Sequence, residues 1–184
     1  MKKIDLKLIS ALLIFQVTFL PASVSLQENA KLEPDSNHPR IEQVISYLLS
    51  RSHYQKKEID DSLSSEFYSN YVESLDGNKS YFLAQDISSF EAFKYELDDS
   101  IRAGSVGPAY QIFNVFIQRF RQRMDYVQKR LDQGFDFAKD EFYQPDRRED
   151  SWAISAKELD EIWRKRIKND ALKLKLAGKE WEDI

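Results

Sequence analysis

The sequence of 184 residues contains no cysteine and only two histidines, His38 and His53. The absence of cysteine excludes disulfide scaffolds, thiolate zinc sites, iron–sulfur clusters and cysteine nucleophiles. Neither histidine has a second one at metal-ligand spacing, so we expect no metal site. With five glycines and five prolines, the chain is neither collagen-like nor of low complexity. A composition of 42% apolar, 32% charged and 13% aromatic residues is instead typical of a domain with a real core.

The few glycines also limit the chemistry that the chain can perform. All five stand at expected turns or helix ends, at positions 77, 104, 107, 134 and 178. None belongs to a loop that would cradle a phosphate or to the strained turn that carries a hydrolase nucleophile. Glu58, Asp60 and Asp61 imitate a carboxylate cluster, but a helix N-terminus favours acidic residues for dipole reasons alone. The sequence therefore predicts no catalytic, cofactor-binding or metal-binding residue.

The first 25 residues are of a different class from the rest. Lysines at positions 2, 3 and 7 precede an apolar run, Leu8–Leu20, and the small residues Ser23 and Ser25 follow. This order is typical of a secretory signal peptide. The run is shorter than the ~20 residues that span a bilayer, although a retained membrane anchor is the alternative. No cysteine follows it, which excludes lipoprotein processing. We expect export to the periplasm and cleavage near Ser25.

The balance of charge argues against nucleic acid as a partner. Removal of residues 1–25 takes away three lysines and one aspartate, which leaves a net charge of −6. Such a balance favours solubility and disfavours general binding of polyanions. Arg119, Arg121 and Arg123 surround Phe120 in a pattern found on nucleic-acid surfaces. Because Phe120 belongs to an apolar stripe, ion pairs on a solvated helix face are the stronger interpretation. We expect neither nucleic acid nor a small-molecule cofactor to bind.

Beyond the leader, residues 26–38 are polar and aperiodic and indicate a linker, and residues 39–184 carry helical periodicity. Apolar residues recur there at intervals of three and four, which predicts an all-α, irregular multi-helix domain of about five helices. Residues 135–152 are rich in aromatics without this period and predict a packed irregular crossing. The expected helices are Pro39–Arg51, Glu58–Leu75, Ile87–Ala103, Pro108–Gln133 and Ser155–Ala177, the last opened by a capping box from Ser155 to Glu158.

Each expected helix has an apolar face that should be buried. In the first helix this face comprises Ile41, Val44, Ile45, Leu48 and Leu49. In the second it comprises Ile59, Leu63, Phe67, Tyr71 and Leu75. In the third it comprises Ile87, Phe90, Phe93, Leu97 and Ile101. In the fourth it comprises Phe113, Phe116, Phe120, Met124, Val127 and Leu131. In the last it comprises Leu159, Ile162, Trp163 and Ile167.

Two separated strings resemble those of a known family. The string LDGNKSYFLAQDI at 75–87, followed by Phe90, is similar to the signature "LDP-x-K-x-YFL-x-x-D". The stretch with EL at 158–159, Trp163, RIKND at 166–170 and LKLKLAGK at 172–179 is similar to "EL-x-x-x-W…KLxGK". Both signatures lie in the N-terminal helical domain of tail-specific proteases, which are C-terminal processing peptidases of peptidase family S41. The resemblance covers about residues 38–184. It departs from the family pattern at Gly77 and Ser151, where proline is usual.

The resemblance implies a periplasmic serine-type endopeptidase that degrades proteins from apolar C-termini. In the family, a PDZ domain captures the substrate C-terminus, and a downstream domain cleaves with a serine nucleophile and a lysine base. These parts follow the matched region, so no catalytic residue carries over to a chain that stops at Ile184. We therefore expect a truncated, non-catalytic N-terminal module that is inactive alone.

The implied partners are proteins. Substrates with apolar C-termini would bind through the missing domains, and a periplasmic adaptor protein is a further candidate. A stand-alone periplasmic helical module that binds proteins without cleaving them is the alternative function. A PDZ-like segment and a serine–lysine core encoded downstream would favour the protease module, and a true stop codon would favour the stand-alone module.

The leader generates the first testable prediction. Mass spectrometry of the periplasmic fraction should find a mature N-terminus between Ala22 and Gln27, because the small residues that signal peptidase reads lie there. Recovery of an intact Met1 terminus in the membrane fraction would contradict cleavage and favour the retained anchor.

Overall fold

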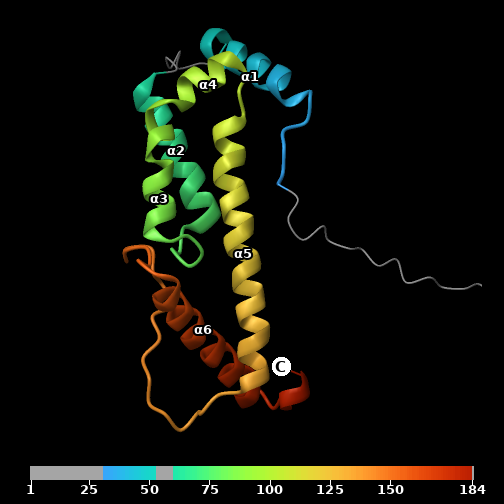
Figure 1. The fold of residues 1–184 in the computed structure, drawn as a ribbon, viewed down its shortest axis with the longest axis vertical. Helices are drawn as coiled ribbons and strands as arrows, with labels where there is room; N and C mark the ends of the chain where they lie inside the picture. The colour runs from blue at the N-terminus through green and yellow to red at the C-terminus, as the bar shows by residue number, and fades with distance from the viewer. Residues whose placement is uncertain (1–30, 53–59, 184) are drawn as a thin grey trace, which may run out of the picture. The chain divides into compact units, whose positions relative to one another are not determined.

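The structure is a computed structural model that describes residues 31–52 and 60–183 (Figure 1). The predicted signal peptide, residues 1–25, lies outside the described residues, as do His53, Glu58 and Ile59. Within the described ranges, no helix is long and apolar enough to cross a membrane.

The described residues form six α-helices and no β-strand, which confirms the all-α prediction. The α-helices are α1 (His38–Ser52), α2 (Asp61–Asp76), α3 (Ala84–Phe90), α4 (Leu97–Ala103), α5 (Gly107–Gln133) and α6 (Ala156–Leu176). Two short 3-10 helices are η1 (Glu91–Tyr95) and η2 (Trp181–Asp183). A single pair of residues, Leu83 and Ala153, forms an isolated parallel bridge in this part of the chain. The predicted irregular crossing is present between α5 and α6.

The predicted third helix, Ile87–Ala103, is wrong as one continuous element, because the structure divides it into α3, η1 and α4. A fully buried side chain of α2 enters at the division: the Ser64 hydroxyl donates to the Lys94 carbonyl at 2.9 Å and accepts from the Leu97 amide at 3.0 Å. These bonds satisfy backbone groups that a break in a helix leaves unpaired. The division therefore depends on a residue more than twenty positions away, which the local periodicity does not report.

The helix faces also differ from the prediction in three places. In α5 the buried residues are Ile112 and Arg123, and Phe120 and Met124 of the predicted stripe are each 38% exposed, because the neighbours of this long helix change from the first core cluster to the second along its length.

In α2 the buried residues are Ser64, Tyr68, Val72 and Asp76, one position beyond the predicted stripe. The reason is that α2 packs against η1 and α4 as well as against α5. The middle of its buried face therefore lies between the side that meets η1 and α4 and the side that meets α5. The predicted stripe of α1 is about half exposed at every described position: Ile41, Val44, Ile45 and Leu48.

The exposure of the α1 stripe follows from how this helix meets α4. The contact passes through Gln43, whose side-chain amide reaches the Ala103 carbonyl at 3.5 Å. Gly104 ends α4 with a φ of +69°, and a Cβ there would lie only 2.9 Å from Gln43 and from the Pro39 carbonyl. Glycine is thus required both by the left-handed conformation and by the close approach. The polar side of α1 faces its neighbour, and the apolar side remains partly open.

The core consists of two clusters that meet at one short segment. Phe82 is fully buried in the first cluster, and the adjacent Leu83 is buried in the second. Successive side chains of an extended segment point to opposite sides, so this segment serves both clusters. The first cluster contains Tyr68, Val72, Phe82, Phe90 and Ile112. The second contains Leu83, Ala153, Leu159, Trp163 and Ile167.

A buried carboxylate positions that segment. Asp76, at the end of α2, is 2% exposed and accepts hydrogen bonds from the amides of Ser80 at 2.6 Å, Tyr81 at 3.0 Å and Phe82 at 2.9 Å. The indole N–H of Trp152 donates a fourth bond at 3.3 Å. Burial raises the pKa of the Asp76 carboxyl, and the four donors act in the opposite direction. The carboxylate replaces backbone partners that these three consecutive amides lack.

Replacement of this carboxylate generates the second prediction. Asp76→Asn turns one acceptor oxygen into a donor that faces other donors, so buried N–H groups lose their partner. We expect the free energy of unfolding to fall by about 2–3 kcal/mol, measured by urea unfolding followed by circular dichroism. Glu73→Gln, an exposed change on the same helix, should alter it by less than about 0.5 kcal/mol. Equal losses in both variants would contradict the role assigned to Asp76.

Candidate interaction surface

The crossing between α5 and α6 is fastened at its C-terminal end to the turn that follows α2. The Asn78 side chain accepts from the Arg147 amide at 2.8 Å and donates to the Pro145 carbonyl at 3.2 Å. The Lys79 ammonium donates to the Asp150 carbonyl at 2.6 Å. Lys79 has a φ of +50°, so the turn holds a non-glycine residue in the left-handed region. Two side chains of one turn thus hold the last third of the crossing through three hydrogen bonds.

Aromatic contacts strengthen the same junction. The Lys79 ammonium lies 4.9 Å from the centre of the Trp152 ring, which is within cation–π range. The Trp163 indole on α6 donates to the Ser80 carbonyl at 2.5 Å, and the Ala84 amide donates to the Ala153 carbonyl at 2.9 Å. The crossing and α6 are therefore both attached to the segment that Asp76 organises.

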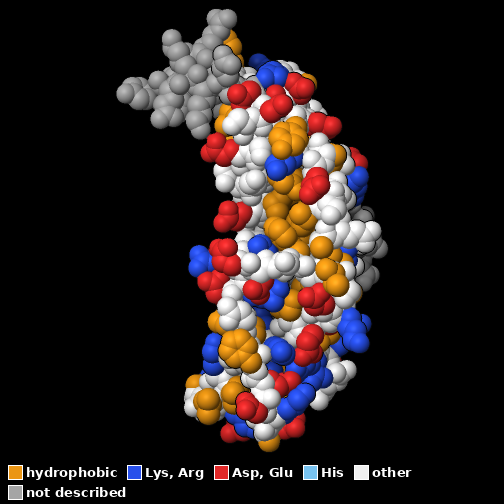
Figure 2. Space-filling view, turned by 90° about the vertical axis from the view of Figure 1, so that its left-hand side faces the viewer, with side chains coloured by type: hydrophobic (Ala, Val, Ile, Leu, Met, Phe, Trp, Pro, Cys, Tyr) orange, Lys and Arg blue, Asp and Glu red, His pale blue; other side chains and the backbone are white. Residues whose placement is uncertain are grey.

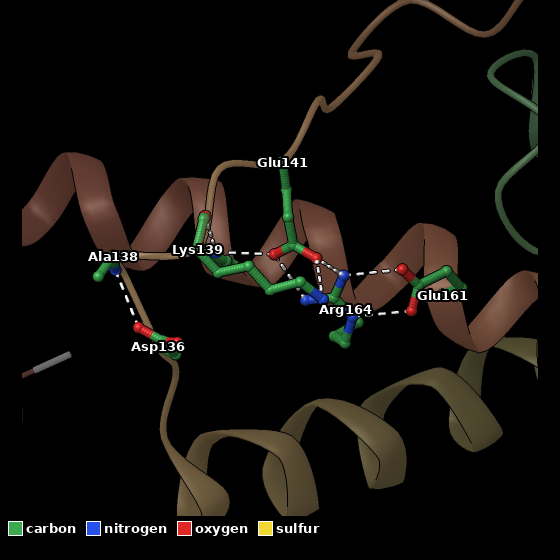
Figure 3. A network of polar contacts seen from close by, with 7 residues as sticks. Asp136, Ala138, Lys139, Glu141, Glu161 and Arg164 are labelled. Carbon is green, nitrogen blue, oxygen red and sulfur yellow. Dashed lines mark hydrogen bonds and ion pairs between the residues drawn. The ribbon is translucent and has the colours of Figure 1, made fainter.

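At its N-terminal end the crossing is fastened by an ionic network (Figure 3). The Glu141 carboxylate accepts from Arg164 at 2.5 Å and 3.1 Å and from the Lys168 ammonium at 2.7 Å. Lys139 adds an ion pair at 3.2 Å, and Arg164 also binds Glu161. The hydrogen bonds from Arg164, and then those from Lys168, hold the pKa of the Glu141 carboxyl well below its usual range. Of these residues only Lys168, in the string RIKND, belongs to the motifs named above.

A groove of about 460 Å³ lies between these two fastenings. One side is the crossing itself, and the other is the first half of α6, as the lining residues show. Phe142 stands at its edge with 76% of its surface exposed, which is unusual for a phenylalanine. The groove is lined by Phe142, Tyr143, Gln144, Arg147, Lys157, Glu158, Glu161, Ile162 and Lys165. Its volume lies within the range of ~300–1,000 Å³ that ligand pockets occupy.

A second hollow, of about 330 Å³, lies between α5 and α6. Its walls are mainly apolar, and Met124 and Leu174 are 38% and 42% exposed at its edge.

Figure 2 shows one face of the molecule, on which hydrophobic side chains alternate with acidic and basic ones, so neither sign of charge dominates that face.

The arginines weighed as a nucleic-acid surface are engaged within the fold. Arg119 binds the Asp86 carboxylate through two nitrogens, at 2.8 Å and 2.9 Å, and Asp86 in turn accepts from the Leu83 amide at 2.9 Å. Arg123 is 6% exposed and pairs with Asp160 at 2.5 Å. These contacts agree with the ion-pair interpretation, and they link α5 to both α3 and α6.

The other candidate groups have local structural partners. His38 Nδ1 accepts from the Asp35 amide at 3.1 Å and lies 3.1 Å from the Tyr110 hydroxyl. Asp60 caps α2 by accepting from the Leu63 amide at 3.0 Å. Across residues 31–52 and 60–183, no group of three or more His, Asp or Glu side chains is arranged to hold a metal ion.

The predicted capping box of α6 is present in modified form. The Ser155 hydroxyl accepts from the Glu158 amide at 3.2 Å, as predicted. The Glu158 carboxylate accepts from the amide of Ile154 at 2.9 Å and not from that of Ser155. The cap therefore also fastens Ile154, in the short link between the crossing and α6.

Comparison with known proteins agrees with the resemblance of the two strings. Residues 44–184 match the family model described as the tail-specific protease N-terminal domain. A tail-specific protease of Haemophilus influenzae is 30% identical over 137 residues, which make up 74% of this chain. The match covers 20% of that relative, so the chain spans about one fifth of the length of the curated protein to which it is similar.

The Glu141 network generates a prediction about pH. Because the folded protein holds the pKa of Glu141 below the ordinary value of 4.5, the network stabilises the fold above that pH and loses this contribution as the pH falls below it. Wild type should therefore melt at a higher temperature than Glu141→Gln at pH 7, and the gap should narrow steadily toward pH 3.

Asp140→Asn is the matched control, since Asp140 is exposed and forms no ion pair with another described residue. Its melting temperature should follow that of wild type across the same range. A gap between wild type and Glu141→Gln that does not change with pH would contradict the role of the network.

Proposed function

Because this chain belongs to the family of tail-specific protease N-terminal domains, we propose that it is the non-catalytic helical module of a periplasmic serine endopeptidase that degrades proteins from apolar C-termini. The observation that carries the proposal is the family match over residues 44–184. The relative from Haemophilus influenzae bears the name of the whole protease, of which this chain corresponds to about one fifth.

The side chains support a role without catalysis. A serine–lysine pair needs a lysine beside a serine hydroxyl, where it can accept the proton. The buried lysine of the described residues, Lys168, contacts the Glu141 carboxylate at 2.7 Å and the Lys139 carbonyl at 2.9 Å. The buried serines have backbone partners: Ser64 joins Lys94 to Leu97, and the Ser80 hydroxyl donates to the Asn78 carbonyl. Neither hydroxyl forms a hydrogen bond with a lysine side chain in the described part.

The architecture supports a bracing role. Helix α5 has 27 residues, so it reaches roughly 40 Å at 1.5 Å per residue. Ile112, near its N-terminus, is buried in the first core cluster, and Val127 and Leu131, farther along, pack against the second. A helix that joins two clusters in this way resists bending at their junction. Such a module suits the wall of an enclosure that holds a substrate for a separate peptidase domain.

The proposal predicts that the purified chain cleaves nothing by itself. An unfolded protein with an apolar C-terminus should remain intact over hours of incubation, as followed by electrophoresis and mass spectrometry. The intact Haemophilus influenzae protease, assayed in parallel, is the positive control. Cleavage that disappears when Lys168 or a described serine is mutated would contradict the non-catalytic role.

The coding sequence downstream of residue 184 gives an independent test. A PDZ-like segment followed by a serine–lysine core would support the protease module. A stop codon at this position, together with a phenotype for the product, would favour the stand-alone binding module instead.

A further inference from the structure

The groove between the crossing and α6 has one wall whose backbone is free to form hydrogen bonds. Residues 141–144 belong to no helix or strand, and their amides and carbonyls form no hydrogen bond with the described residues. Buried backbone groups almost always have partners, and exposed ones can pair with a peptide that lies alongside. Both ends of the crossing are fastened, by Glu141 on one side and through Asn78 on the other. The free stretch is therefore held in place rather than left loose.

The groove also has an apolar floor. Phe142 and Tyr143 contribute from the crossing, and Ile162 contributes from α6. Exposure of 76% for the Phe142 side chain leaves most of its ring available to a ligand. A volume of about 460 Å³ accommodates apolar side chains of an extended peptide but is small for a packed helix.

Some charged side chains that line the groove already have partners within the fold, and others form no ion pair. The Glu158 carboxylate accepts from the Ile154 amide, and Glu161 is bound by Arg164 through both oxygens. In contrast, Lys157 and Lys165 form no ion pair with any residue that the structure describes. Lys165 acts on Glu161 only at longer range, where it adds to the effect of Arg164 in lowering the pKa of that carboxyl.

Arg147, on the same side, is already engaged within the crossing. Its Nη1 pairs with Asp150 at 3.2 Å, its Nη2 donates to the Ser151 carbonyl at 3.3 Å, and its Nε is shielded from solvent. Glu161 is thus neutralised by Arg164, while Glu158 keeps its charge because its hydrogen-bond donor is a neutral amide. The groove therefore has two lysines without an ion pair among the described residues against one unpaired carboxylate, an excess of positive charge. An acidic ligand complements this arrangement, and a basic one does not.

We propose that this groove binds an extended segment of a second protein in which apolar and acidic residues alternate. The apolar side chains enter between Phe142 and Ile162, and the carboxylates reach Lys157 and Lys165. The backbone of the segment pairs with residues 141–144. This proposal does not rest on the proposed function, because the binding requires no peptidase domain.

The test uses the full chain and a fluorescein-labelled peptide with alternating valine and aspartate, followed by fluorescence anisotropy. The aspartate peptide should bind, and more weakly as salt rises. A peptide with lysine in place of aspartate should bind at least about tenfold more weakly, and so should an aspartate peptide with N-methylated valines.

Two pairs of variants separate the groove from general effects of charge and hydrophobicity. The double change Lys157→Glu with Lys165→Glu should weaken binding by about tenfold or more, whereas Lys129→Glu, an exposed change on α5, should not. Phe142→Ser should weaken binding, whereas Ile154→Ser, which alters a side chain that is 82% exposed outside the groove, should not. Thermal melts confirm that all variants fold.

The proposal would be overturned by any of three results: no binding of the aspartate peptide, equal binding of the aspartate and lysine peptides, or groove variants that bind as well as their controls. Because cleavage is not measured, failure here leaves the proposed function intact, and failure of the peptidase test leaves this proposal intact.

Discussion

The arrangement of this domain depends on one buried carboxylate, that of Asp76. It gathers the amides of Ser80, Tyr81 and Phe82, and this fixes the direction in which Phe82 and its neighbour Leu83 point. The two core clusters are built on these side chains. A carboxylate is suited to the task because it offers several acceptor sites and no donor, so it can satisfy consecutive N–H groups at once. The same group receives Trp152, and thereby connects the turn to the crossing more than seventy residues later.

The crossing between α5 and α6 is consequently a supported element although it has no regular secondary structure. Side chains of the turn hold its C-terminal part, and the Glu141 network holds its N-terminal part. Irregular segments lack the repeating backbone bonds of helices, so their order must come from side-chain partners. The stretch between the fastenings keeps unpaired backbone groups at a defined place beside α6. This combination of a fixed frame and free hydrogen-bonding groups makes the segment suitable for recognition.

The proposed non-catalytic role implies a division of labour between this module and a separate peptidase domain. The charged side chains of Lys168 and Arg119 are used here to join elements: Lys168 joins α6 to the crossing, and Arg119 joins α5 to α3. Burial of such groups is tolerable only with close partners, which commits them to structure. The module then contributes surfaces and rigidity to the larger protease that we propose.

The sequence by itself determined the helical class, the ends of α1, α5 and α6, and the family, because these depend on local periodicity, on capping residues and on contiguous strings. It also located the turn after α2, but not the role of Asp76, since a buried acid resembles an exposed one in the sequence. Only the tertiary structure decided that Ser64 divides the third helix, that the α1 stripe is half exposed, and that Glu141 meets Arg164. The physical reason is that burial and ion pairing depend on which elements lie side by side. The groups that bond the free backbone at a helix break, bury an apolar helix face or pair with a charged side chain come from distant parts of the chain. Periodicity within one helix carries no information about them.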